Sequence, residues 1–293
     1  MARDPDPILV TGATGYVGSE LLPELLRRGR TVRALARDPA RADLPAGVDA
    51  RRGDAVSGQG LPEALDGCAT AYYLIHSMDG NRDFAARDRT AAVNFGEAAR
   101  AAGVGRVVYL GGLGSEDSEH LRSRLQVAEL LGQRVPELVH LRAAMVIGAG
   151  SASFVMLRSL VARLPVMVCP RWIDTRTQPV AIRDVVRALA DAGELEQSPG
   201  EVQLGGADVL TYRAMMERTA IALGRRAPRI ATVPVLSPRL SSYWVMLVTP
   251  VDAGLVRPLV DGLRSEMLVQ VPPPDGINDA PLGFDDAVRE ALR

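Results

Sequence analysis

The sequence contains no lysine, and all 34 residues counted as Lys or Arg are arginine. Apart from three histidines, every basic side chain among the 293 residues therefore carries a guanidinium group. Arginine stays protonated and binds anions in a bidentate way, whereas the ammonium group of lysine can shift its pKa and take part in catalysis. No mechanism that depends on a side-chain ammonium group is open to this chain.

Basic clusters, reactive thiols and long apolar runs are also scarce. The net charge is -1 and the arginines form no cluster, which argues against nucleic-acid binding through a basic patch. Cys68 and Cys169 lie far apart in apolar surroundings, so we expect buried, reduced thiols. Residues 1–7 are too polar for a signal peptide, and no apolar run reaches the roughly 18 residues of a transmembrane segment. We expect a cytoplasmic protein and leave open whether it is a monomer or a homodimer.

The first half of the chain alternates short apolar runs with longer helical patterns, which is typical of a parallel sheet covered by helices. The expected strands are residues 7–11, 31–36, 48–52, 70–75, 106–110 and 138–145. The expected helices are residues 16–28, 61–65, 84–102 and 118–132. Several strands are apolar at consecutive positions, as in strands that are buried on both faces. The pattern predicts a Rossmann-like, doubly wound α/β fold with a parallel sheet.

The second half has a looser pattern. Three more helices are expected at residues 153–164, 182–192 and 212–223, separated by Pro- and Gly-rich connections. We expect a core over residues 1–150 and a small C-terminal lobe over residues 151–293, packed together as one continuous unit. Residues 240–271 are apolar with few charges. Their role stays open between lobe core, pocket wall, dimer surface and membrane contact.

A glycine-rich turn follows the first strand, where ILVTGATGYVG at residues 8–18 runs into G-x-x-G-x-x-G. Gly12 permits the tight turn, Gly15 lets the backbone approach a pyrophosphate, and Gly18 lets the helix pack closely on the strand. Amides at the helix N-terminus then face the phosphate charge. The motif predicts a dinucleotide site with these contacts: Thr11, Gly12, Thr14, Gly15, Tyr16, Val17 and Gly18.

The end of the second strand predicts which dinucleotide is bound. Sites that prefer NAD usually place Asp or Glu there, whereas this chain has Ala36 followed by Arg37. Arg37 can pair with a 2′-phosphate in bidentate geometry, and Arg41 can add a second contact. NADP(H) is therefore the expected cofactor, and NAD(H) is not excluded because Asp38 is adjacent. After the third strand, Asp54 and Ala55 are candidate contacts to adenine, although an ordinary turn explains these residues almost as well.

These motifs resemble those of the atypical or extended short-chain dehydrogenase/reductase superfamily, in particular its NmrA-like NAD(P)H-binding branch. The resemblance is carried by TGATGYVG at 11–18, VRALARDP at 32–39, Val93-Asn94, RVVYL at 106–110 and QPVAIRDVV at 178–186. It covers about residues 7–230. It implies a Rossmann core that binds NAD(P)H and a substrate cleft opening after the sixth strand.

The active site implied by the resemblance is altered. Members of the superfamily typically use a serine and a Tyr-x-x-x-Lys pair, in which tyrosine exchanges a proton while lysine lowers its pKa and holds the ribose. The aligned residues here are His120 and Arg124, and GGLG at 111–114 stands where the hydroxyl would be. Because the chain has no lysine, the standard mechanism is absent.

Three interpretations follow. In the first, His120 is a general acid with a pKa near 6.5, Arg124 holds the ribose and stabilises charge, and His76 is a second candidate acid. In the second, hydride passes to a quinone or conjugated acceptor and water completes the protonation. In the third, the protein is a non-catalytic, NADP(H)-binding redox-sensing regulator of the NmrA type. His140 lies inside an expected strand and is interpreted as a core residue.

An apolar pocket favours an enzyme over a sensor. The side chains expected to line it are Met145, Ser151, Phe154, Met156 and Trp172, with Tyr243 and Trp244 as further candidates. Such a pocket accepts hydrophobic small molecules, which makes the C-terminal lobe the expected substrate-binding part. We therefore expect an NADPH-dependent oxidoreductase that reduces a hydrophobic carbonyl, enone or quinone-like compound without a metal.

Overall fold

The computed structural model describes residues 6–76, 83–114, 118–233, 248–251, 260 and 262–293. Its centre is a seven-stranded sheet in the order β11-β6-β5-β4-β1-β2-β3, and every neighbouring pair is parallel. The strands are β1 (Ile8–Thr11), β2 (Val32–Ala36), β3 (Asp49–Arg52), β4 (Thr70–Tyr73), β5 (Arg106–Gly112), β6 (Glu137–Ala143) and β11 (Glu201–Leu204). This arrangement confirms the predicted Rossmann-like fold.

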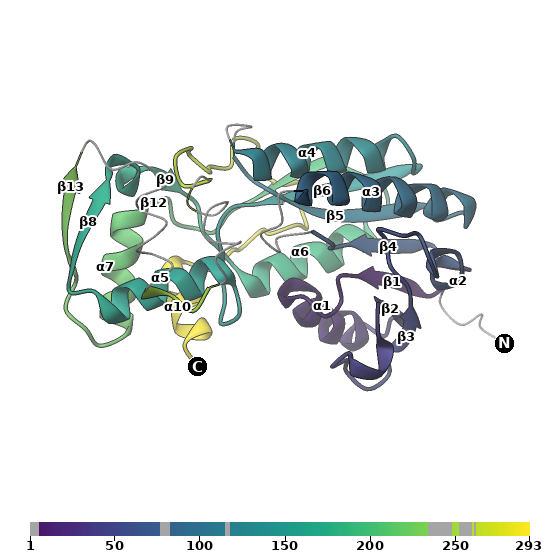
Figure 1. Cartoon of the computed structure of the whole chain (residues 1–293), viewed down its shortest axis with the longest axis horizontal. Helices are drawn as coiled ribbons and strands as arrows, with labels where there is room; N and C mark the ends of the chain where they lie inside the picture. The colour runs from purple at the N-terminus through teal and green to yellow at the C-terminus, as the bar shows by residue number, and fades with distance from the viewer. Residues whose placement is uncertain (1–5, 77–82, 115–117, 234–247, 252–259, 261) are drawn as a thin grey trace.

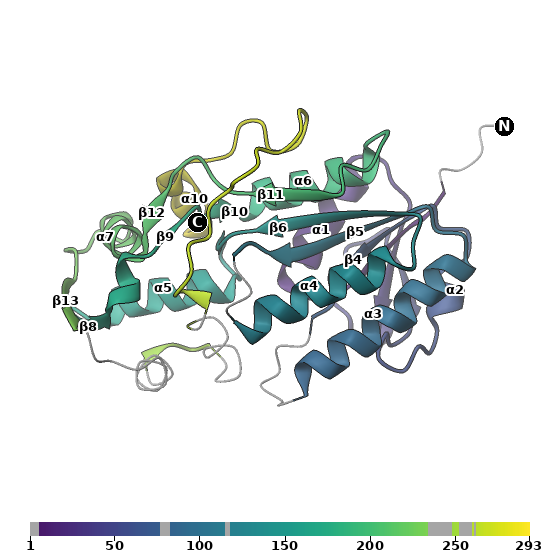
Figure 2. The same cartoon turned by 90° about the horizontal axis from the view of Figure 1, so that it is seen from above.

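Helices cover both faces of the sheet (Figures 1 and 2). One face carries α1 (Tyr16–Arg27) and α6 (Ile182–Glu194), and the other carries α2 (Leu61–Leu65), α3 (Phe84–Ala101) and α4 (Glu119–Gly132). Apolar side chains of the central strands alternate between the two resulting cores, so that Val10 packs toward α1 while Leu9 packs toward α3. Burial on both faces explains why these strands are continuously apolar.

The strand order reverses between β1 and β4, which are neighbours in the sheet. From β1 the chain first adds β2 and β3 on one side, and it then adds β4, β5 and β6 on the other side. The connections therefore leave a crevice at the carboxyl ends of these two strands, where ligands bind in open α/β sheets. The glycine-rich turn follows β1 at this position.

A smaller lobe lies at the other end of the molecule, on the left of Figure 1. It contains α5 (Ala152–Arg163), α7 (Tyr212–Ala222), α10 (Phe284–Ala291) and the short helix η2 (Arg171–Asp174). Three strand pairs complete it: β7 (Val146–Ile147) with β10 (Val180–Ala181), β9 (Arg176–Thr177) with β12 (Leu210–Thr211), and β8 (Val166–Pro170) with β13 (Arg229–Val233). Its separate apolar core is centred on Phe154, Met215 and Phe284.

Two elements of the second half return to the nucleotide-binding core. Strand β11 extends the sheet beside β6, and α6 packs on α1. Residues 151–293 therefore form the lobe and also contribute one strand and one helix to the nucleotide-binding core. The predicted helices agree with the observed ones to within about two residues, but the pattern gave no expectation of β11 or α10. Among the described residues, no helix is long and apolar enough to cross a membrane.

Candidate functional site

The turn after β1 has the backbone that its glycines predict. Gly12 has a φ of 65°, and a Cβ there would lie 2.6 Å from the Leu74 carbonyl oxygen. A Cβ on Gly18 would lie 2.2 Å from the Gly12 oxygen, so only glycine lets α1 approach β1 this closely. The N-cap of α1 is Gly15, and no side chain caps the helix there. The first amides of α1 are therefore available to a phosphate.

Thr11 and Thr14 flank this turn in different ways. The Thr11 hydroxyl is fully buried; it donates to the Tyr72 carbonyl oxygen at 3.1 Å and accepts from the Leu74 amide at 3.2 Å. It thereby ties β1 to the end of β4. Thr14 is exposed at the turn. Thr11 thus stabilises the turn through buried hydrogen bonds, whereas the side chain of Thr14 is exposed.

Tyr16 begins α1 and lies against the segment that leads into the lobe. A Cβ on Gly150 would lie 2.6 Å from its ring, and a Cβ on Gly148 would lie 2.1 Å from its hydroxyl oxygen. Burial raises the pKa of Tyr16, so its hydroxyl stays protonated at neutral pH. The two glycines make room for the ring, which therefore connects the cofactor turn to the start of α5.

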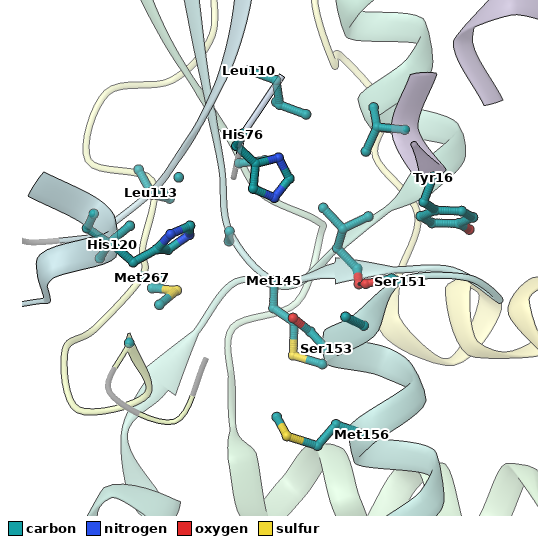
Figure 3. A pocket seen from close by; sticks show the side chains of 18 of the residues that line it. Tyr16, His76, Leu110, Leu113, His120, Met145, Ser151, Ser153, Met156 and Met267 are labelled. Carbon is teal, nitrogen blue, oxygen red and sulfur yellow. Dashed lines mark hydrogen bonds between the residues drawn. The ribbon is translucent and has the colours of Figure 1, made fainter. Parts of the chain in front are cut away.

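A cavity of about 610 Å³ joins the turn to the lobe. Figure 3 shows it bordered by His76 and His120 on one side, by Tyr16 and Ser151 on another, and by three methionines. Most of its wall is apolar, and none of the described residues that line it is Asp or Glu. Its size and composition suit a small hydrophobic molecule. The predicted residues that line it are Gly12, Gly15, Tyr16, Val17, Gly18, His76, His120, Arg124, Met145, Ser151, Met156 and Trp172.

His76 and His120 meet at this cavity although they are 44 residues apart in sequence. His76 follows β4 and His120 lies in the first turn of α4, with ring centroids 6.4 Å apart (Figure 3). Desolvation by surrounding protein is the main cause that lowers both pKa values, and the cation of Arg124 lowers them further. The pKa of His120 falls to about 3. The expected value near 6.5 is therefore wrong, and both imidazoles are neutral at pH 7.

Arg124 lies one helical turn after His120 and lines the same cavity. Its Nη1 donates to the Leu110 carbonyl oxygen at 2.7 Å, which fixes the guanidinium at the end of β5. Its Nε is buried and has no hydrogen-bond partner. Within the described part of the chain, no carboxylate forms an ion pair with it. Among the described residues, this end of the cavity therefore carries one positive charge without an ion-pair partner and two neutral imidazoles.

The missing hydroxyl at the end of β5 has a structural cause. A Cβ on Gly111 would lie 2.3 Å from Nε2 of His140 on the neighbouring strand β6. His140 is buried and stacks on Tyr109 with centroids 5.1 Å apart. A serine at position 111 would therefore collide with this imidazole. Burial confirms His140 as a core residue, but its Nε2 has no hydrogen-bond partner among the described residues, and the sequence pattern does not connect it to Gly111.

The lobe side of the cavity differs in part from expectation. Phe154 is fully buried in the lobe core and does not line the cavity. The Ser151 hydroxyl donates to the Val146 carbonyl oxygen at 2.7 Å, so it is already engaged. Tyr243 and Trp244 lie outside the described residues. Further wall residues that the sequence did not single out are Leu113, Leu157, Leu160, Tyr212, Met216, Val260, Leu263 and Met267.

The remaining cofactor candidates lie on the far side of the turn, at the ends of β2 and β3. Arg37 and Arg41 are exposed, and the side chain of neither forms an ion pair or hydrogen bond with the residues that the structure describes. Asp54 accepts a hydrogen bond from the Val56 amide at 2.7 Å, which closes a turn. Asn94 of α3 holds this turn by donating to the carbonyl oxygens of Ala55 and Val56 at 3.1 and 2.8 Å. From the sequence, Asn94 is expected only as part of a family motif.

A family model described as NAD(P)H-binding matches residues 12–159. Among curated proteins, the chain is 35% identical over 88 residues to dihydroflavonol 4-reductase of Zea mays, covering 27% of this chain and 25% of that protein. It is 34% identical over 112 residues to a 3β-hydroxysteroid dehydrogenase/Δ5→4-isomerase of Mycobacterium tuberculosis, covering 35% of this chain and 30% of that protein. The chain thus spans about a quarter of the length of the first curated relatives that it matches.

Solved structures resemble the chain over nearly its whole length. Citrobacter sp. triphenylmethane reductase complexed with NADP(H) has a TM-score of 0.77 at 20% identity, covering 97% of this chain and 100% of that one. A nucleoside-diphosphate-sugar epimerase of Staphylococcus aureus has a TM-score of 0.75 at 18% identity, with coverage of 97% and 100%. At these identities the likeness shows the fold, including the C-terminal lobe.

Proposed function

The chain belongs to the NAD(P)H-binding family, within the short-chain dehydrogenase/reductase superfamily that its motifs predicted, and we propose that it is an NADPH-dependent oxidoreductase. Its substrate is a hydrophobic carbonyl, enone or quinone-like compound. One observation carries the proposal: a single apolar cavity contains both the cofactor turn and the His76, His120 and Arg124 side chains. The reductase names of Zea mays and Citrobacter relatives point the same way.

The residues of the nucleotide side fit a dinucleotide phosphate. The uncapped amides at the start of α1 and the absence of acidic residues in its first turn suit a pyrophosphate. Arg37 and Arg41, which have no other ionic partner among the described residues, would hold the 2′-phosphate. Asp54 and Ala55 would lie beside adenine, in a turn that Asn94 keeps in place. Reduced NADPH, when bound, supplies the hydride.

At the end of the cavity beside Arg124 and His120, the side chains would stabilise negative charge on the substrate and would not donate a proton to it. Arg124 would hold the ribose and offset negative charge that develops on the substrate oxygen. His120, with His76 behind it, would donate a hydrogen bond from a neutral imidazole to the same oxygen, as its lowered pKa requires. The mostly apolar walls lower the polarity around the reacting atoms and strengthen these interactions. The final proton then comes from solvent.

The test is a titration of the purified chain with NADPH and NADH, followed by a panel of quinones, enones and ketones while the absorbance of the reduced cofactor is recorded. We expect tight NADPH binding and consumption with at least one acceptor class. Tight binding without consumption across the panel would overturn the enzyme proposal. It would instead favour the redox-sensing regulator, and the search would turn to protein partners that distinguish NADPH from NADP⁺.

A further inference from the structure

Hydroxyl groups are scarce on the wall of the cavity. Among the described wall residues, those that carry one are Tyr16, Ser151, Ser153 and Tyr212. The hydroxyl of Tyr16 lies against the backbone that precedes α5, and that of Ser151 donates to a backbone carbonyl oxygen. The hydroxyl of Tyr212 is enclosed by the protein. Ser153 therefore carries the wall hydroxyl that remains for a ligand.

Ser153 is the second residue of α5, and Figure 3 shows its side chain pointing into the cavity from the lobe side. The residue is half-buried, and its hydroxyl is neither enclosed by the protein nor hydrogen-bonded to a described residue. Its labelled neighbours on this wall include Met145 and Met156, whose side chains are apolar. The hydroxyl is thus an isolated polar group on an apolar part of the wall.

This hydroxyl is separate from the polar groups at the reacting end of the cavity. His76 follows β4, and His120 and Arg124 belong to α4, so that end is built by the nucleotide-binding core. Helix α5 belongs to the lobe, so Ser153 reaches the cavity from a different part of the fold. A ligand that extends from Arg124 to the lobe meets polar side chains at two places.

A lone hydroxyl on an apolar wall selects among hydrophobic ligands. In an open cavity, water hydrogen-bonds to it, and a ligand that fills the cavity displaces this water. A ligand without a polar atom opposite the hydroxyl leaves it unpaired, which costs free energy, whereas a ligand with such an atom replaces the lost bond. Sites that hydrogen-bond a substrate group discriminate against analogues that lack it for this reason.

We propose that Ser153 is a specificity-determining residue whose hydroxyl hydrogen-bonds a second polar atom of the substrate, while the reducible group lies beside Arg124. This inference rests on the proposed function, because it assigns a further contact to the substrate of the same cavity. It narrows that substrate to hydrophobic compounds that carry a hydroxyl or carbonyl oxygen in addition to the group that accepts the hydride.

The test compares pairs of chalcones, which are aryl enones, that carry either a hydroxymethyl or an ethyl group. The two substituents are similar in size, and placing them at the para and meta positions of either ring samples different reaches. Calorimetry in the presence of NADP⁺ measures the dissociation constants, and NADPH consumption gives kcat/KM for the same compounds. For at least one position, the preference for hydroxymethyl over ethyl should be about tenfold larger in the wild-type chain than in Ser153→Ala, the effect of one hydrogen bond.

Two further variants separate this contact from general effects. Ser153→Thr keeps a hydroxyl at the same position and should keep the wild-type preference. The matched control is Ser159→Ala, which makes the same change on the same helix at a buried serine that does not line the cavity. Its preference should equal that of the wild type. NADP⁺ should bind equally well to the wild-type chain and to Ser153→Ala.

The two proposals fail in different ways. If chalcones are reduced but no pair distinguishes the wild-type chain from Ser153→Ala, the hydroxyl binds only water or its own backbone and the inference is overturned. If chalcones bind but no acceptor of any class is reduced, the proposed function fails, while the calorimetric preference still tests Ser153. A preference that falls equally in Ser159→Ala, or weaker NADP⁺ binding in Ser153→Ala, would also overturn the assignment of this hydroxyl to the substrate.

Discussion

Arg124 carries the fixed positive charge at the reacting end of the cavity, while the two histidines beside it are neutral at pH 7. A neutral imidazole donates a hydrogen bond but gives up that proton far less readily than an imidazolium ion does. Under the proposed function, charge stabilisation at the substrate oxygen would therefore fall to the guanidinium, and orientation to the imidazoles. Under the proposed function, these three side chains would stand in for the Tyr-x-x-x-Lys pair of the superfamily.

Replacing Arg37 with Glu tests the cofactor assignment. The exposed guanidinium has no ionic partner among the described residues, so the change removes a phosphate contact and adds repulsion. We expect the dissociation constant for NADPH to rise about 100-fold or more, and that for NADH to change by less than about threefold. Fluorescence titration with both cofactors measures this. Equal effects on NADPH and NADH would rule out the 2′-phosphate contact.

His120→Gln tests the role of the neutral imidazole. The amide keeps some hydrogen-bonding capacity but loses the geometry, so kcat should fall by about 10- to 100-fold with little change in NADPH affinity. Since the pKa of His120 is about 3, wild-type kcat/KM should also stay level between about pH 5.5 and 8 as far as this residue is concerned. A turnover rate that is unchanged in the variant would remove His120 from the mechanism.

At the scale of elements, the parts that local pattern specifies were predictable. The turn after β1 needs glycine at Gly12 and Gly18 for reasons of backbone space, and those reasons can be read from the sequence. Contacts between elements that are distant in the sequence could not be predicted from the local sequence pattern. The collision that excludes a side chain at Gly111 depends on His140 of the next strand, and the meeting of His76 with His120 depends on the register of β4, β5 and α4.

The contact between α1 and the segment before α5 can be tested by a double-mutant cycle. A methyl group at position 150 would lie 2.6 Å from the Tyr16 ring, and its three nearest heavy atoms all belong to that ring. Gly150→Ala should therefore destabilise the chain by about 1–3 kcal/mol and weaken NADPH binding, because Tyr16 begins the helix of the cofactor turn. In a Tyr16→Ala background the same change should cost little.

Urea unfolding and NADPH titration of the wild type, both single variants and the double variant measure this coupling. Gly29→Ala is an unsuitable control because its φ is positive, whereas Gly105→Ala meets only ordinary contacts at 3.7 Å. If Gly150→Ala costs the same with and without the Tyr16 ring, the two elements are not coupled through this contact.

At the scale of the whole molecule, the strand order and the two-part build follow from alternating strands and helices, whereas the return of the chain to the sheet at β11 does not. A four-residue strand beside a loop carries too weak a pattern to be distinguished from a turn. The cavity is likewise a property of the whole molecule, because its wall combines the cofactor turn, the end of β5, α4, α5, α7 and the segment around Met267. Predicted pocket residues such as Met156 lie on it, but Phe154, two positions away, faces the lobe core instead.

All three histidines have lowered pKa values, which makes global stability depend on pH. Burial is the main cause for His140, whose pKa falls to about 4 because desolvation and the cations of Arg142 and Arg124 outweigh the Glu201 carboxylate. In the unfolded chain a histidine binds a proton below about pH 6.5, whereas the folded chain does not until about pH 4. The unfolded state thus binds more protons in this window, so stability falls as pH falls.

We expect the free energy of unfolding to decrease by up to about 1.4 kcal/mol per pH unit for each of His120 and His140 between about pH 6.5 and 5. Carboxyl groups with lowered pKa values, such as Glu24 at about 2, change the free energy of unfolding only below about pH 4.5. Between pH 6.5 and 5 the pH dependence therefore comes from the histidines. Urea unfolding of the wild type and of His140→Gln at pH 7.5, 6 and 5 measures the slope. The variant should be less stable at pH 7.5, since it loses the stack on Tyr109, yet its stability should fall less steeply. Parallel curves for the two proteins would show that His140 is protonated in the folded chain as readily as in the unfolded one.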